Sequence, residues 1–261
     1  SEQAEGERTA LNDFRAELVA DGSWNWTRPN IFSAESSEGA NLEQLSDGRL
    51  LASGENPAND TWTIQFETDQ TDLRAILLEV LRHDSLPSGG PGRAGNGNMI
   101  LSGISVEFAP ANHPERVQPL DLVWAWADIE QTNDDFKVVN ALRPEDGRMW
   151  AINAHQDRDD RYAVFVTDEP FGFESGTLIT VNLSFESPYA QHAPGHIGLQ
   201  VGTASSDAIS RLATAASNWY IVGPFSTQDG PEAYDTIFGP EAVGPLDFEE
   251  SWQGQSWRYA P

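Results

Sequence analysis

Histidine and acidic side chains are the groups with which this chain could carry out acid–base or metal chemistry. One pair among its five histidines, His192 and His196, has the four-residue spacing of a helical zinc site, but Pro194 and Gly195 between them preclude a helix. The chain has no cysteine, which excludes thiol nucleophiles and thiolate metal ligands, and no G-x-S-x-G motif for a serine nucleophile. The sequence therefore predicts no catalytic residues and a protein that is not an enzyme.

Nine tryptophans form a second set of candidates, because an aromatic face packs well against the apolar C–H surface of a pyranose ring. Most large aromatic side chains fill cores, and Trp62 is expected there because it lies in an alternating pattern. Trp24 and Trp26 lie in a loop-like stretch that ends at Pro29, and Trp150 follows an Asp-Gly turn. We expect Trp24, Trp26 and Trp150 to contact a ligand.

A glycine-rich block, SGGPGRAGNGN at residues 88–98, is a distinctive local motif. It is not a phosphate-binding loop, because it lacks the final G-K-[ST] and no helical pattern follows it. Arg93 could offer a planar fork to a pair of sugar hydroxyls, with amide contacts from Asn96 and Asn98. The alternative is structural, with Arg93 tying the loop to an acidic neighbour and the asparagines capping turns. With His83 added, the predicted ligand-binding residues are Trp24, Trp26, His83, Arg93, Asn96, Asn98 and Trp150.

The charge balance is strongly acidic, with 41 acidic residues against 15 basic ones and a formal net charge of −26. Such a surface repels polyanions, so nucleic acid is excluded as an expected partner. Acidic runs at residues 133–135 and 157–160 could supply the oxygen ligands that calcium prefers, but neither has the glycine and closing glutamate of an EF-hand. Solvated charge is the default interpretation, and the sequence identifies no metal ligands.

Strand patterns dominate the chain. Residues 60–68 alternate Trp62, Ile64 and Phe66 with polar side chains, as a half-buried antiparallel strand does. Residues 73–83 fit a buried strand or a helix, and their place between two strand patterns favours a strand. Trp124 and Trp126 share one face of a strand, as either a core pair or an exposed platform. The remaining predicted strands are residues 98–110, with Gly103 as a bulge, and residues 120–130, 161–167, 176–187 and 196–204.

This strand series predicts an all-β fold of jelly-roll β-sandwich type, because no helical crossover separates consecutive strands. Residues 1–20 are expected to be an entry segment with a short helix, and residues 21–204 to be the sandwich domain. Small and polar residues become frequent near residue 205, where we place a domain boundary. Residues 205–261 are expected to be a linker and either a short C-terminal extension packed on the sandwich or the start of a second domain.

Three stretches resemble a known family. They are SLPSGGPGRAGNGNMILSGISVEF at residues 85–108, the stretch from NALRPEDGRMWAI at residue 140 to HAPGHIGLQV, and WYIVGPF followed by FGPEAVGPLDFEESW. Together they are similar to the non-haem domain of the cytochrome-c-linked proteins typical of planctomycetes, over most of the chain after residue 40. Where that family has Ala-Ile-Asp-Gly-Asp, this chain has Asn140-Ala-Leu and then Pro144-Glu-Asp-Gly147. The resemblance implies a galactose-binding-like sandwich that binds polysaccharide, and a structural calcium ion held mostly by backbone carbonyls.

Motifs and resemblance together predict a non-catalytic polysaccharide-binding module of a larger secreted, periplasmic or cell-surface protein. Its expected partners are a glycan and the neighbouring domains of the parent protein. Membrane insertion is not expected, because no apolar run approaches the ~20 residues needed to cross a bilayer. One alternative is a β-sandwich polysaccharide lyase or hydrolase acting through acidic residues and His83, His155 or His196, since glycoside hydrolysis needs only two carboxylates. Another is a purely structural interdomain docking domain.

Overall fold

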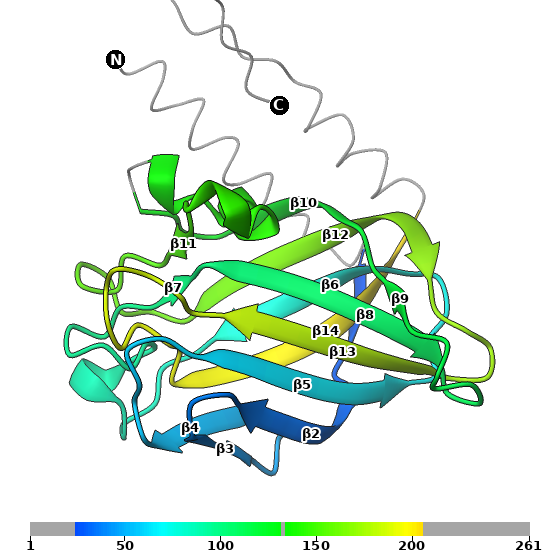
Figure 1. Cartoon of the computed structure of the whole chain (residues 1–261), viewed down its shortest axis with the longest axis horizontal. Helices are drawn as coiled ribbons and strands as arrows, with labels where there is room; N and C mark the ends of the chain where they lie inside the picture. The colour runs from blue at the N-terminus through cyan, green and yellow to red at the C-terminus, as the bar shows by residue number, and fades with distance from the viewer. Residues whose placement is uncertain (1–23, 132–133, 206–261) are drawn as a thin grey trace, which may run out of the picture. The chain divides into compact units, whose positions relative to one another are not determined.

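The structure, a computed structural model, describes residues 24–131 and 134–205 (Figure 1). The entry segment expected at residues 1–20 and the expected C-terminal segment beyond Ser205 lie outside the described residues. Within them the chain forms fourteen β-strands and four short 3-10 helices. None of the described helices is long and apolar enough to cross a membrane.

Two antiparallel sheets contain most of the strands, which pack as two layers around one core (Figure 1). The seven-stranded sheet has the order β10-β12-β6-β14-β4-β3, and β1 also pairs with β14. The five-stranded sheet has the order β2-β5-β13-β8-β9. The strands of the larger sheet are β1 (Trp24–Thr27), β3 (Ala40–Gln44), β4 (Leu50–Gly54), β6 (Leu73–Val80), β10 (Leu122–Ala127), β12 (Arg161–Phe171) and β14 (His196–Ala204). Those of the smaller sheet are β2 (Asn30–Ser36), β5 (Thr61–Thr68), β8 (Gly103–Pro110), β9 (Gln118–Pro119) and β13 (Thr177–Ser184).

A third pair of short strands closes one end of the sandwich, on the left in Figure 1, where β7 (Ile100–Leu101) pairs with β11 (Trp150–Ala151). Four 3-10 turns lie in the connecting segments. They are η1 (Pro87–Gly89), η2 (Asp134–Phe136), η3 (Val138–Leu142) and η4 (Pro144–Asp146).

Apolar and polar side chains alternate along the strands, and the apolar ones form the core between the two sheets. On β5, Trp62, Ile64 and Phe66 are fully buried between the sheets, while the intervening residues face solvent. Nε1 of Trp62 donates a 2.8 Å hydrogen bond to Asp60, which gives its one polar group a partner inside the core. Successive strands alternate between the sheets, from β4 to β5 to β6 and from β12 to β13 to β14. The predicted all-β jelly-roll β-sandwich is confirmed.

Three local predictions differ from the structure. Trp24 and Trp26 lie on strand β1 and not in a loop, because β1 pairs with β14 over all four of its residues. The region from Asn30 to Gly54, for which the alternation predicted no strands, forms β2, β3 and β4. Gly103 is not a bulge, because β8 pairs with β13 without a register shift, and the strand instead breaks at Ser102 where the chain changes sheets.

Candidate functional site

The glycine-rich block forms a compact turn at the β7–β11 end of the sandwich. Gly92 donates its N–H to the carbonyl oxygen of Gly97 at 2.8 Å, and a Cβ at Gly92 would overlap the carbonyl group of Asn98. Only glycine allows this close backbone approach. The block is therefore tightly packed backbone, which explains its composition.

This block supports the segment that leads into β14. The N–H of Arg93 donates to the carbonyl of Ala193 at 2.9 Å, and that of Gly195 donates to Pro91 at 2.8 Å. Just after the block, the N–H of Ile100 donates to the carbonyl of His192 at 2.9 Å. These bonds run along both sides of the segment and hold its backbone in place.

The Arg93 side chain is buried and bonds within the protein. Nη1 donates to the carbonyl of Glu55 at 2.7 Å and Nη2 to that of Gly54 at 2.8 Å. Burial lowers the pKa of Arg93. Arg93 thus joins the block to the end of β4 through carbonyl oxygens, and not through the acidic neighbour considered from the sequence.

The two asparagines of the block have different positions. Asn96 is exposed, and its Oδ1 accepts the N–H of Asn98 at 3.0 Å in a local turn. Asn98 is buried, and its Oδ1 accepts the N–H of Ala154 at 3.0 Å, which ties the block to the loop after β11. Asn96 is the member of this pair that can reach a ligand without rearrangement.

Trp150 and His83 have structural contacts. Trp150 is fully buried on β11, and its Nε1 donates to the carbonyl of Ile129 at 2.9 Å, so its ring faces the core. The ring of His83 lies edge-on to the buried His196, with centroids 5.6 Å apart. Nδ1 of His83 lies 2.7 Å from Oγ of Ser85, and Nδ1 of His196 donates to the carbonyl of Arg82 at 3.2 Å.

Three rings that are not among the predicted ligand-binding residues lie together at this end of the molecule. Tyr189 is 49% exposed, and its ring centroid lies 6.3 Å from that of Phe136 and 6.0 Å from that of His192. Phe136 and His192 are each partly buried. We call Phe136, Tyr189 and His192 the aromatic platform. The available sequence signal was an aromatic residue after the turn-forming Ser-Pro at residues 187–188.

The platform is held from beneath and from its flanks. Phe136 packs on a small apolar cluster formed by Ile100, Met149 and Ala151, so β7 and β11 fix its position. Oγ of Ser187 donates to the carbonyl of Tyr189 at 2.8 Å and accepts the N–H of Tyr189 at 3.1 Å. The N–H of Ser187 donates in turn to Oδ1 of Asn59. Tyr189 therefore sits on a short loop whose backbone is already ordered.

A hydrogen bond to the backbone determines which ring nitrogen of His192 carries the proton. Its Nδ1 lies 2.8 Å from the carbonyl oxygen of Ala190, which can only accept, so Nδ1 carries the proton. The neutral ring then has a lone pair on Nε2. The platform thus combines three ring faces with one hydrogen-bond acceptor.

Trp24 and Trp26 lie far from the platform, toward the other end of β14. Their rings stack with centroids 5.2 Å apart and an interplanar angle of 10°. Trp24 is only 6% exposed and Trp26 is partly exposed. Trp26 packs over Gly202, where a Cβ would lie 2.6 Å from Cε3 of the indole. Trp24 and Trp26, which were considered together in the sequence analysis, are thus in direct contact.

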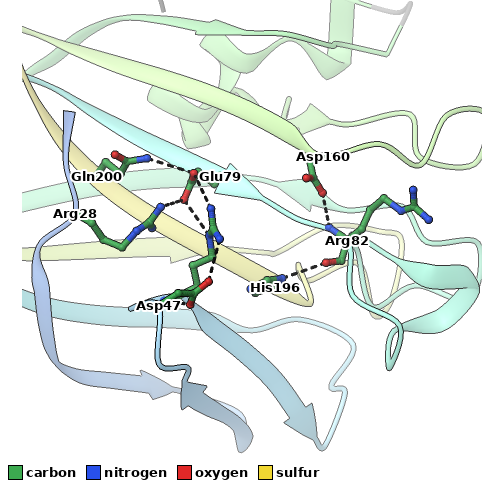
Figure 2. A network of polar contacts seen from close by, with 8 residues as sticks. Arg28, Asp47, Glu79, Arg82, Asp160, His196 and Gln200 are labelled. Atoms are coloured by element: carbon green, nitrogen blue, oxygen red, sulfur yellow. Dashed lines mark hydrogen bonds and ion pairs between the residues drawn. The ribbon is translucent and has the colours of Figure 1, made fainter. Parts of the chain in front are cut away.

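Beside this pair, a polar network covers the face of the seven-stranded sheet opposite the core (Figure 2). Glu79 on β6 has a side chain that is 6% exposed, and Nη2 of Arg28 lies 2.6 Å from its Oε2. Nη2 of Arg49 and Nε2 of Gln200 lie 3.4 and 3.2 Å from its Oε1. Gly198 leaves room for this carboxylate, because a Cβ there would overlap it.

Asp47 completes the network, with Oδ2 2.9 Å from Nη1 of Arg49 (Figure 2). The backbone N–H of Arg49, followed by its side chain, lowers the pKa of Asp47. Two guanidinium groups are thus matched by two carboxylates. The network balances its own charge.

Among the described residues, no group of three or more histidine, aspartate or glutamate side chains is placed to hold a metal ion. A calcium ion held mostly by backbone carbonyls stays a prediction.

No protein-family model and no curated protein matches the chain. One solved structure to which it is similar is a carbohydrate-binding module of the β-sandwich superfamily, described for promiscuous specificity. The TM-score is 0.26 at 10% sequence identity, and the similarity covers 69% of this chain and 55% of that chain. The chain therefore spans little more than half the length of that structure. The fold assignment rests on the strand topology above.

Proposed function

We propose that this protein is a non-catalytic polysaccharide-binding module and that the aromatic platform contacts the sugar. The observation that carries the proposal is the exposed ring of Tyr189, flanked by Phe136 and His192 on an ordered loop. An exposed aromatic face stacks on the C–H surface of a sugar ring, and a fixed ring loses little conformational entropy on binding. Nε2 of His192 supplies an acceptor for a sugar hydroxyl.

The charge of the chain narrows the ligand to neutral glycans. A net charge of −26 repels carboxylated and sulfated polysaccharides at the distances from which a polymer approaches. Stacking and hydrogen bonding to hydroxyl groups require no charge on the sugar. Neutral polysaccharides such as xylan, mannan and β-glucan are therefore the expected class.

The residues named from the sequence have a supporting role in this proposal. Arg93 and Asn98 join the glycine-rich block to β4 and to the loop after β11, and Trp150 lies in the strand that backs Phe136. Loops that bind ligands are commonly positioned by such a rigid scaffold. Asn96 is the exposed residue of the block and is available for an additional contact.

The proposal also includes the setting that the family resemblance implies. The protein is a secreted, periplasmic or cell-surface one, and this module holds a larger polypeptide on polysaccharide. Binding of this kind involves no bond breaking and needs no catalytic residue.

The test compares Tyr189→Ala with the wild-type chain in affinity electrophoresis through gels containing xylan, mannan or β-glucan. Retardation of the wild-type protein by at least one polymer is expected, together with about a tenfold loss of affinity in the variant, equivalent to ~1.4 kcal/mol. Phe32→Ala is the matched control, because Phe32 is an aromatic residue of similar exposure, 56%, on β2 outside the platform. Wild-type protein that migrates unretarded in every gel, or equal losses in both variants, would overturn the proposal.

A further inference from the structure

We propose a second glycan site, beside Trp26 and Arg28 on the face of the seven-stranded sheet opposite the core; this inference rests on the proposed function. It would bind the same neutral polymer as the aromatic platform. The two sites together would make the module bivalent toward a single polysaccharide chain.

Two unused hydrogen-bond donors mark this site. Within the part of the chain that the structure describes, Nε1 of Trp26 and Nη1 of Arg28 are buried and have no hydrogen-bond partner. Trp26 lies on β1 and Arg28 follows the end of that strand. Their side chains lie against Gly202 and Gly198, which are four positions apart on β14 and therefore on the same face of the sheet. Buried donors without partners are rare in folded proteins, and ligand oxygens that accept from these two groups would recover lost hydrogen bonds.

Two glycines of β14 allow these donor side chains to lie close to the sheet. Opposite Trp26 on β14 lies Gly202, and Gly198 lies beside the contact between Arg28 and Glu79. At both positions a Cβ would collide with the donor side chain. Trp24 supports the other side of Trp26 by stacking. The indole N–H of Trp26 and the guanidinium N–H of Arg28 are therefore held along the same face of β14.

The surrounding charge indicates an uncharged ligand. Glu79 already accepts hydrogen bonds from Arg28, Arg49 and Gln200, and Asp47 pairs with Arg49. Because the carboxylates offset both guanidinium charges, little positive potential remains to attract a carboxylate or sulfate. Hydroxyl and ring oxygens of a neutral sugar can accept from both donors. The side chain of Arg28 is 23% exposed, which gives a ligand access to that residue.

The spacing of the two sites sets the length of the ligand. Trp26 pairs with Gly202, six residues along β14 from His196, which corresponds to about 20 Å of strand. His192 precedes His196 by four further residues. A short oligosaccharide therefore occupies one site, whereas a polymer spans both. Linking two binding events in this way typically raises the apparent affinity by about 10²- to 10⁴-fold.

The test measures binding of xylan, mannan and β-glucan, and of the disaccharide repeat of each, by isothermal titration calorimetry. Trp26→Phe keeps an aromatic ring in the stack and removes the indole donor. Expected is a loss of at least tenfold in affinity for the polymer that the wild-type chain binds, with unchanged affinity for the disaccharide at the platform. Arg28→Lys, which removes the guanidinium donor, is expected to act in the same direction. Trp124→Phe is the matched control, because Trp124 is a partly exposed tryptophan on β10.

The outcomes separate the two proposals. Polymer affinity that falls in Tyr189→Ala but stays at the wild-type level in both Trp26→Phe and Arg28→Lys would overturn the second site and leave the proposed function standing. An equal loss in Trp124→Phe and Trp26→Phe would also overturn it. No binding of any polymer by the folded wild-type chain would overturn both.

Discussion

Nη1 of Arg93 donates a 2.7 Å hydrogen bond to the carbonyl oxygen of Glu55, more than thirty residues earlier in the chain. A second bond from Nη2 reaches Gly54. The glycine-rich block is thereby attached to the end of β4, and the block in turn supports the segment that carries His192. One buried guanidinium group thus joins three parts of the chain at the end of the sandwich where the platform lies.

Arg93→Ala is expected to lower the free energy of unfolding by about 3–6 kcal/mol, because it removes two hydrogen bonds from a charged group and each contributes about 1.5–3 kcal/mol. Urea denaturation followed by tryptophan fluorescence measures this loss. Arg82→Ala is the control, since the Arg82 side chain is exposed and 4.0 Å from its acidic neighbour, Asp159, so a change within about 0.5 kcal/mol is expected. Equal stability of Arg93→Ala and wild type would contradict the role given to Arg93.

Glu79→Gln is expected to destabilise the fold by about 1–3 kcal/mol. Removing the charge leaves Arg28 without a carboxylate and Arg49 with Asp47 alone, but both arginines are partly exposed, so the loss is smaller than the ~3–5 kcal/mol of a fully buried pair. Because Glu79 itself is shielded from solvent, the loss should persist at high salt. Urea denaturation at low and high sodium chloride concentration tests both statements.

Asp146→Asn is the control for this prediction. Asp146 pairs with Arg148 at 3.1 Å, and both side chains are exposed. An exposed pair contributes about 0–1 kcal/mol and is screened by salt. Destabilisation of the same size in Asp146→Asn and Glu79→Gln would show that burial of Glu79 has no special effect.

The pH dependence of stability should include a contribution from Asp157. A hydrogen bond from the side chain of Arg161, with Nη2 2.8 Å from Oδ2, lowers the pKa of Asp157 below its ordinary value of 3.8. A lowered pKa in the folded state stabilises the fold above 3.8, and this contribution is lost as the pH falls through the lowered value. Thermal unfolding between about pH 6 and about pH 3 should therefore show a smaller acid-induced fall in Tm for Asp157→Asn than for wild type. Identical pH profiles would exclude this contribution.

The sequence predicted those strands whose side chains alternate between core and solvent. Residues 60–68, 176–187 and 196–204 became β5, β13 and β14 with nearly the same bounds. The four strands before residue 55 were not predicted as strands. β1 alternates tryptophan with polar residues over only four positions, which is too short to predict a strand, and β3 is a polar edge strand with no buried side chain.

The candidate site was harder to predict because its contacts are long-range. Arg93, Asn98 and Trp150 were picked by residue type and local motif, but their partners were not readable from the local sequence. Phe136 and Tyr189 lie on separate loops, and the pairing of β7 with β11 positions Phe136 within reach of Tyr189. No local pattern marks such a pair, because only the topology of the sandwich brings the two loops together.

Gly202→Ala is expected to displace the ring of Trp26. The added Cβ would collide with the six-membered ring, and β14 pairs on both sides, so the indole is the group that must move. Overpacking of this kind costs about 1–3 kcal/mol, and separation of Trp26 from Trp24 should reduce the near-ultraviolet circular dichroism of the stacked pair. Gly95→Ala is the matched control, because a Cβ there meets no atom within 4 Å. An unchanged spectrum in Gly202→Ala would show that this glycine does not hold the stack in place, whereas a changed spectrum together with weaker polymer binding would connect the stack to the second glycan site.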